Sequence, residues 1–103
     1  MNSDKFFIIT IDKDAALSSF NYREFHNKLI SINGVKAWWH YLESTYIIKV
    51  DFSVKANHIA DLMKIIAPNK KFFATEINFN DYSGWLPQEA WDWIRDNAKQ
   101  NNG

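Results

Sequence analysis

The sequence contains no cysteine. Disulfide bonds, thiolate catalysis and zinc–thiolate sites are therefore excluded. A net charge is also missing, since Lys plus Arg and Asp plus Glu number 12 each. Proteins that bind nucleic acid tightly and without sequence preference usually carry a basic excess, because neutralised phosphates supply most of their affinity. The charge balance counts against that class and favours self-association.

Long apolar runs are absent as well. The opening residues, MNSDKFFIIT, contain no more than four consecutive apolar side chains. That pattern predicts neither a signal peptide nor a membrane span. We therefore expect a cytoplasmic protein without a membrane partner. A hydrophobic content of 47% with 17% aromatic residues is typical of a folded globular chain, and 103 residues suit a single domain.

The most informative stretch runs from Ala37 to Asp51, with the sequence AWWHYLESTYIIKVD. Bulky aromatic residues precede Glu43-Ser44, and an alternating β-branched run follows them. This pattern predicts two strands joined by a tight turn.

The remaining elements can be placed around this hairpin. Five segments are predicted: a strand at 5–12, a helix capped by Asn21 and ended by Asn33-Gly34, a helix at 54–67 capped by Ser53, a strand at 72–79, and a helix at about 86–97 that starts near Pro87. The apolar run at 5–12 predicts a strand buried on both faces. Glu24, three residues after Asn21, completes the pattern of a capping box.

The order strand, helix, strand, strand, helix, strand is that of an α+β ferredoxin-like βαββαβ domain with a four-stranded antiparallel sheet. We expect its core at about 5–80, and the third helix is an addition to it. Right-handed crossovers would place the first and third strands centrally and the first two helices on one face. The other face would then be open.

Two residues are candidates for chemistry. Asp12, at the end of the first strand, could act as a base or hold Mg²⁺, with Asp14 as a second ligand; the alternative is a residue that simply opens a loop. His40 could be a general acid or read a nucleobase between stacking rings; the alternative is a hydrogen-bonded strand residue. His26 and His58 are predicted to be surface residues.

Aromatic residues form a third set of candidates. They are Trp38, Trp39, Tyr41 and Tyr46 in the hairpin, and Trp85, Trp91 and Trp93 in the tail. Such rings could stack nucleic-acid bases or form a core and a subunit contact. We expect 85–94 to pack on the domain or across a subunit boundary, with Gly84 reversing the chain. Three exposed tryptophans would otherwise make an unusual apolar patch.

Several of these segments resemble a known family. KFFIITID, ending in Asp12, resembles the opening strand of the CRISPR-associated Cas-two proteins, small ferredoxin-like dimers described as metal-dependent nucleases or as subunits of the spacer integrase. WWHYLESTYII and YSGWLPQEAWDWI are similar to segments of short bacterial proteins labelled SinR-like or Cas-two-like. The resemblance covers about residues 5–94.

The resemblance implies a homodimer in which two Asp12 carboxylates, one per subunit, bracket a magnesium ion. The chain departs from the family after the first strand, where Lys13 is followed by Asp14 and Ala15, and in the tail, where a tryptophan-rich helix replaces a swapped strand. The zero net charge, the excess of aromatic residues and the lack of a convergent set of titratable residues in the sequence favour a homodimeric, non-catalytic interaction module. The alternative is a metal-dependent nuclease or a nucleic-acid-binding subunit that uses Asp12.

Overall fold

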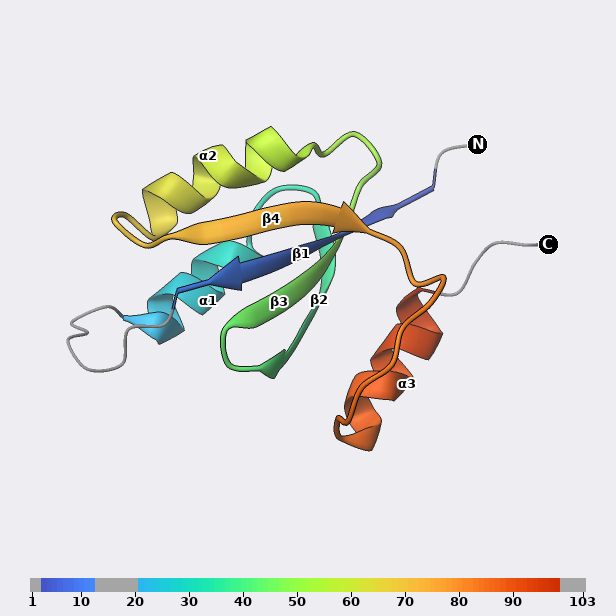
Figure 1. Cartoon of the computed structure of the whole chain (residues 1–103). Helices are drawn as coiled ribbons and strands as arrows, with labels where there is room; N and C mark the ends of the chain where they lie inside the picture. Colours follow the sequence, from blue (N-terminus) through green and yellow to red (C-terminus); the bar gives the residue numbers. More distant parts are fainter. Residues whose placement is uncertain (1–2, 13–20, 99–103) are drawn as a thin grey trace.

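The computed structural model describes residues 3–12 and 21–98, and its elements are labelled in Figure 1. The four strands are β1 (Lys5–Ile11), β2 (Val35–Leu42), β3 (Thr45–Val50) and β4 (Phe72–Ile77). The three helices are α1 (Tyr22–Ile30), α2 (Ala56–Ile66) and α3 (Gln88–Asn97). The predicted order of elements is thus confirmed, with ends that differ by a few residues.

The strands form one antiparallel sheet in the order β2-β3-β1-β4. The central positions of β1 and β3 were predicted and are confirmed. In β1, alternate residues face opposite sides, so Phe7, Ile9 and Ile11 are buried on one face while Phe6 and Ile8 contribute to the other. The register between β2 and β3 shifts twice. One shift lies between Val35 and Ala37, and the other lies between Trp39 and Leu42.

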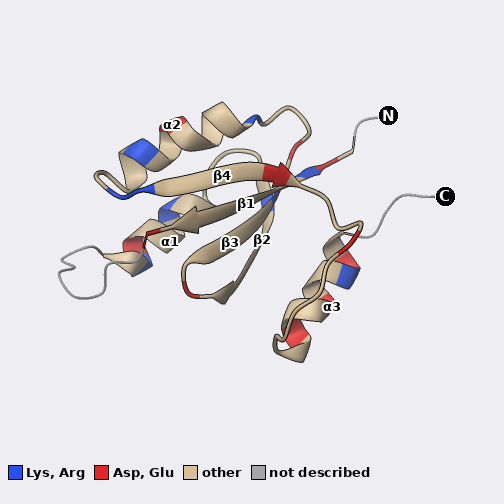
Figure 2. Ribbon diagram, in the orientation of Figure 1, with Lys and Arg blue, Asp and Glu red and all other residues tan. Residues whose placement is uncertain are grey.

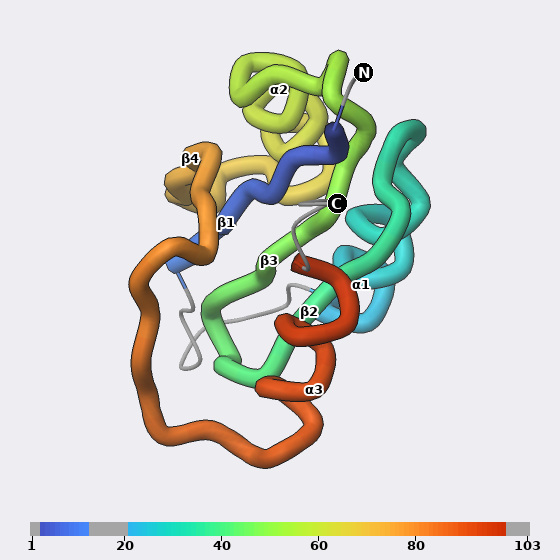
Figure 3. The backbone as a smooth tube through the Cα atoms, turned by 90° about the vertical axis from the view of Figure 1, so that its right-hand side faces the viewer, coloured from blue at the N-terminus to red at the C-terminus, as the bar shows by residue number. Residues whose placement is uncertain are grey.

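One face of the sheet is covered by α1 and α2 (Figure 3). The two helices contribute Phe25, Leu29, Ile59 and Met63 to this main core, at spacings of three to four residues that place them on one side of each helix. The strands contribute inward-facing residues of β1 and β3. Burial of this apolar surface is the main stabilising contribution to the fold.

The opposite face carries a second, smaller core beneath α3 (Figure 3). Trp39 and Ile47 from the sheet pack with Ala90 and Ile94 from the helix, and all four are buried. The prediction that this face is open is therefore wrong for the part that α3 covers. The apolar side of α3 provides the cover, because it would otherwise be exposed to water.

The helix starts follow local hydrogen bonding. Asn21 Oδ1 accepts a 3.0 Å hydrogen bond from the Glu24 backbone N–H, as a helix cap does. The prediction of Ser53 as the cap of α2 is wrong, because its backbone N–H and hydroxyl donate to the Asp51 carboxylate instead. The helix begins two residues later, and His58 Nδ1 accepts from the Lys55 N–H.

Charged side chains of both signs are present on every helix (Figure 2). Exposed pairs join Lys36 with Asp4 at 2.8 Å and Arg95 with Asp92 at 3.1 Å. Such surface pairs add little stability. Within residues 3–12 and 21–98, no helix is long and apolar enough to cross a lipid bilayer.

Candidate functional site

A hollow of about 210 Å³ lies where the end of β1, the start of α1 and the β2–β3 hairpin meet. We call it the histidine pocket, and it is lined by Ile11, Tyr22, Arg23, Phe25, His26, His40, Glu43 and Tyr46. The strand and helix residues come together because β1 ends beside the hairpin turn, where the Ile11 N–H donates to the Ser44 carbonyl at 2.9 Å.

A hydrogen bond between His26 and Tyr46 forms the buried side of the pocket. Nδ1 of His26 lies 2.6 Å from the phenol oxygen of Tyr46. Burial raises the pKa of Tyr46 to about 12, so the phenol is neutral near pH 7. Burial, and then the charge of nearby His40, lower the pKa of His26 and favour its neutral form. The pair is therefore a neutral hydrogen bond.

His40 is fixed by two contacts. Its Nδ1 lies 3.0 Å from the Thr45 carbonyl oxygen, which can only accept, so Nδ1 carries the proton and donates. Nε2 is then left with a lone pair in the neutral imidazole. The ring stacks on Tyr46, with 3.9 Å between centroids and 1° between planes. Because Tyr46 occupies one face of His40, no base can be sandwiched between these two rings.

Trp38 closes the cluster from the outside. Its ring meets that of His26 edge to face, with centroids 4.7 Å apart, and it is 41% exposed. The prediction that His26 is a surface residue is wrong, because its ring lies between Trp38 and Tyr46. The sequence contained a signal for this position. His26 follows Tyr22 by four residues, which places the two side chains on the same side of a helix.

Asp12 lies beside the pocket but does not line it. It is exposed at the end of β1, and its backbone N–H donates to the Lys71 carbonyl at 2.8 Å. Among the residues that the structure describes, no group of three His, Asp or Glu side chains could hold a metal ion. Asp14, the predicted second ligand, lies outside the described residues.

The hairpin aromatics divide between the two faces of the sheet. Tyr46 belongs to the main core, and Trp39 to the second core beneath α3. Tyr41 packs edge to face on Trp39, with 5.4 Å between centroids, and is partly exposed. The stacking surface predicted from adjacent strands is therefore not continuous, because neighbouring residues of β2 point to opposite sides.

The tail tryptophans also differ from one another. Trp91 and Trp93 are half-buried against the second core, and Tyr82 stacks on Trp91 with 6.2 Å between centroids. Trp85 is 99% exposed, so it does not pack on the domain of its own chain. It lies in the connection between β4 and α3. Its packing across a subunit boundary, the other predicted arrangement, stays a prediction.

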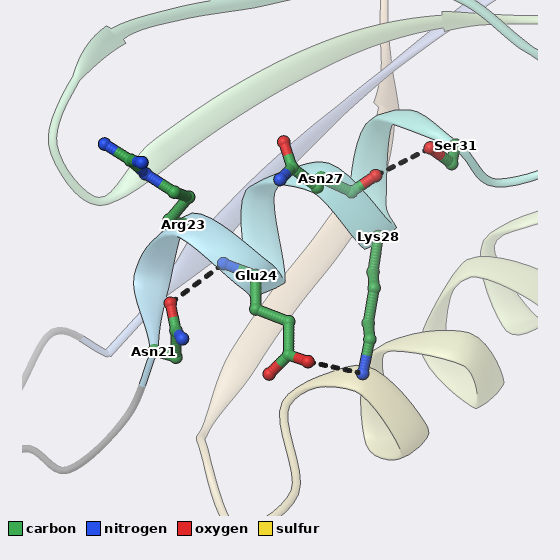
Figure 4. A pocket seen from close by; sticks show the side chains of 6 residues that line it. All are labelled: Asn21, Arg23, Glu24, Asn27, Lys28 and Ser31. Carbon is green, nitrogen blue, oxygen red and sulfur yellow. Dashed lines mark hydrogen bonds and ion pairs between the residues drawn. The ribbon is translucent and has the colours of Figure 1, made fainter.

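A second hollow, of about 500 Å³, lies along the outer side of α1. Figure 4 shows that its side chains all come from the same helix and its ends. Glu24 pairs with Lys28 at 3.6 Å, and the Ser31 hydroxyl donates to the Asn27 carbonyl. Arg23 projects away from the Glu24–Lys28 pair (Figure 4). This is a solvated helix surface, where polar groups do not converge from several elements as they do in the histidine pocket.

Comparison with protein-family models, with curated proteins and with solved structures found no match for this chain.

Proposed function

We propose that this protein is a ferredoxin-like, homodimeric interaction module. The strand order supports the fold. Helix α1 connects β1 to β2, and β3 lies between these two strands in the sheet. Helix α2 connects β3 to β4, and β1 lies between them. Each half is thus a split β-α-β unit. The Cas-two-like resemblance of 5–94 points to the same arrangement and to a dimer.

The observation that carries the dimer is an uncovered end of the second sheet face. Phe72 and Ala74 pack against the main core, so Phe73 between them points to the opposite side, where it is 64% exposed. Its cross-strand partner on β1, Thr10, is exposed too. The contacts of α3 with the sheet are centred on β2, at the other edge.

A second copy of the chain is the occupant that we propose for this surface. The chain has no net charge, so long-range repulsion between copies is small. A ring such as Phe73 gains stability when it is removed from water. Trp85, which is 99% exposed, adds a large apolar group to the connection between β4 and α3.

Light scattering coupled to size exclusion tests the dimer. We expect a dimer at high micromolar concentration, and a Phe73→Glu variant that is monomeric, because the carboxylate would be placed in the contact. Ile65→Glu is the matched control, since Ile65 is 72% exposed but lies on α2, beyond the other face. A wild-type chain that stays monomeric, or equal dimerisation of both variants, would contradict the proposal.

A nucleic-acid-binding subunit is the second candidate. The observation that favours it is the position of Asp12, which is exposed and lies beside Lys71. Lys70 and Lys71 directly precede β4. Among residues 3–12 and 21–98 of one chain, no group of three His, Asp or Glu side chains could supply the several oxygen ligands that Mg²⁺ prefers, so no reaction step is assigned to a metal. RNA and DNA titrations at two salt concentrations test this candidate, because phosphate-driven binding weakens steeply as salt rises. Lys71→Gln should reduce the salt slope by about one, and an absence of binding at low salt would exclude this candidate.

A further inference from the structure

We propose that the histidine pocket binds a nucleobase, that is, a flat heteroaromatic ring with hydrogen-bond donors and acceptors on its edge. This inference rests on the walls and polar groups of the pocket. It does not depend on the oligomeric state of the chain.

The apolar lining of the pocket is already in place. Phe25 and Tyr46 are buried in the main core, and their rings meet edge to face with centroids 6.0 Å apart. Ile11 is buried beside them, and the imidazole of His40 is held by its stack on Tyr46. Phe25 and Tyr46 are 2% and 4% exposed, so they give the pocket an apolar lining but little ring surface for stacking. An apolar lining with a few placed polar groups is typical of sites for small organic rings. Because the main core fixes these side chains, little order is lost when a ligand enters.

The size of the pocket sets a limit on the ligand. About 210 Å³ is below the roughly 300–1,000 Å³ of sites for drug-sized molecules. One ring system fits that space better than a complete nucleotide, whose sugar and phosphate would extend into solvent.

The polar groups define what the edge of the ring must offer. His40 Nε2 presents a lone pair, because its Nδ1–H is committed to the Thr45 carbonyl. Arg23, on the α1 side, presents a planar fork of N–H donors. A ligand must therefore offer an N–H donor to His40 and an acceptor to Arg23. Nucleobases carry both kinds of group on their edges.

Other ligand classes fit less well. A metal would need more ligands, and among the described residues no group of three His, Asp or Glu could supply them. An oxyanion would meet the Glu43 carboxylate in the pocket lining. Burial and the nearby His40 lower the pKa of His26, which favours the neutral imidazole and so weakens its attraction for an anion. Tyr22 and Tyr46 add phenol groups to the lining, and a phenol can donate or accept a hydrogen bond.

Two sources could supply the base: a free nucleoside or an unpaired base in a single-stranded nucleic acid. Calorimetry and NMR titration of the full chain with guanosine, adenosine, cytidine and uridine test the shared chemistry. A six-nucleotide single strand of the preferred base then separates the sources. Tighter binding of the strand assigns the site to nucleic acid, and equal or weaker binding assigns it to the free nucleoside.

Inorganic phosphate is the probe that distinguishes a base from an anion. A nucleobase site should bind nucleosides and leave phosphate unbound at the same concentration. Binding of phosphate without binding of any nucleoside would overturn the proposal in favour of an oxyanion site.

Variants locate the binding in the pocket. Arg23→Ala and His40→Phe should each weaken nucleoside binding by about tenfold, the equivalent of one good hydrogen bond. Arg95→Ala and His58→Phe are the controls on α3 and α2, and they should bind as the wild type does. Arg23 is exposed, so its variant keeps the test decisive even if His40→Phe does not fold. No binding of any nucleoside at millimolar concentration, or unchanged binding by Arg23→Ala, would overturn the proposal.

Discussion

The indole N–H of Trp39 donates a 3.2 Å hydrogen bond to the carbonyl oxygen of Ala90, across 51 residues of sequence. The bond joins β2 to the first turn of α3, and both residues are buried. It satisfies the one polar atom of a large ring that would otherwise be costly to bury. The tail helix is thereby fixed on the sheet in a specific position.

Trp39→Ala should reduce the free energy of unfolding by about 3–5 kcal/mol, the usual effect of truncating a buried tryptophan. Urea unfolding followed by circular dichroism measures this. Trp85→Ala is the matched control, and it should change stability by no more than about 0.5 kcal/mol because the side chain is exposed. Equal losses in the two variants would contradict the packing of α3 on Trp39.

Deletion of residues 84–103 should expose Trp39 and Ile47, which α3 covers. We expect a chain that unfolds at lower temperature and aggregates, since an apolar patch is then open to water. Thermal melts and light scattering measure both effects. A truncated chain that remained folded and soluble, with its oligomeric state unchanged, would indicate that the helix serves another partner instead.

Stability should fall in alkali because of Tyr46. Its pKa in the folded chain is about 12, whereas an unfolded tyrosine ionises near 10. The raised pKa therefore stabilises the fold fully below pH 10, and this contribution is lost as the pH rises towards 12. Urea unfolding at intervals between pH 8 and pH 12 should show a shallower decline for Tyr46→Phe than for the wild type. A decline as steep in Tyr46→Phe as in the wild type would exclude this role of Tyr46.

Acid should act through His26. Its pKa is lowered from the ordinary value of 6.5 by burial first and by His40 second, so the unfolded chain takes up a proton before the folded chain does. The free energy of unfolding should therefore decrease as the pH falls through 6.5. A flatter acid-side profile is expected for His26→Gln than for the wild type. Equal slopes for His26→Gln and the wild type would exclude this role of His26.

The glycines offer a matched pair for backbone strain. Gly34 has φ +99°, and an added Cβ would lie 3.0 Å from Val54 Cγ2. Gly34→Ala should cost about 1 kcal/mol or more. At Gly84, which we predicted to reverse the chain, φ is not positive and the nearest atom to a Cβ is 3.5 Å away. Gly84→Ala should change the melting temperature little, and a larger effect there than at Gly34 would contradict the geometry.

Local patterns account for most of the fold that the sequence predicted. The alternation in 45–50 fixed which side chains of β3 face the helices, because successive strand residues point to opposite faces. Asn21 marks the start of α1 through its hydrogen bond to the Glu24 N–H. Asn33-Gly34 was predicted to end this helix, but α1 ends at Ile30, and the left-handed Gly34 lies in the turn directly before β2. Ser53 was a second exception, since the Asp51 carboxylate competed for its hydroxyl and delayed the start of α2.

Only the tertiary structure decided the site. His26 and Tyr46 are 20 residues apart, and nothing in either local pattern shows that α1 packs against β3 at that point. The crossover of α1 over the sheet brings them within hydrogen-bond distance, and burial then shifts both of their pKa values. The tail is the same case: its apolar spacing predicted a packed helix, but the shape of the surface around Trp39 determined that Ala90 and Ile94 are buried while Trp85 is left in water.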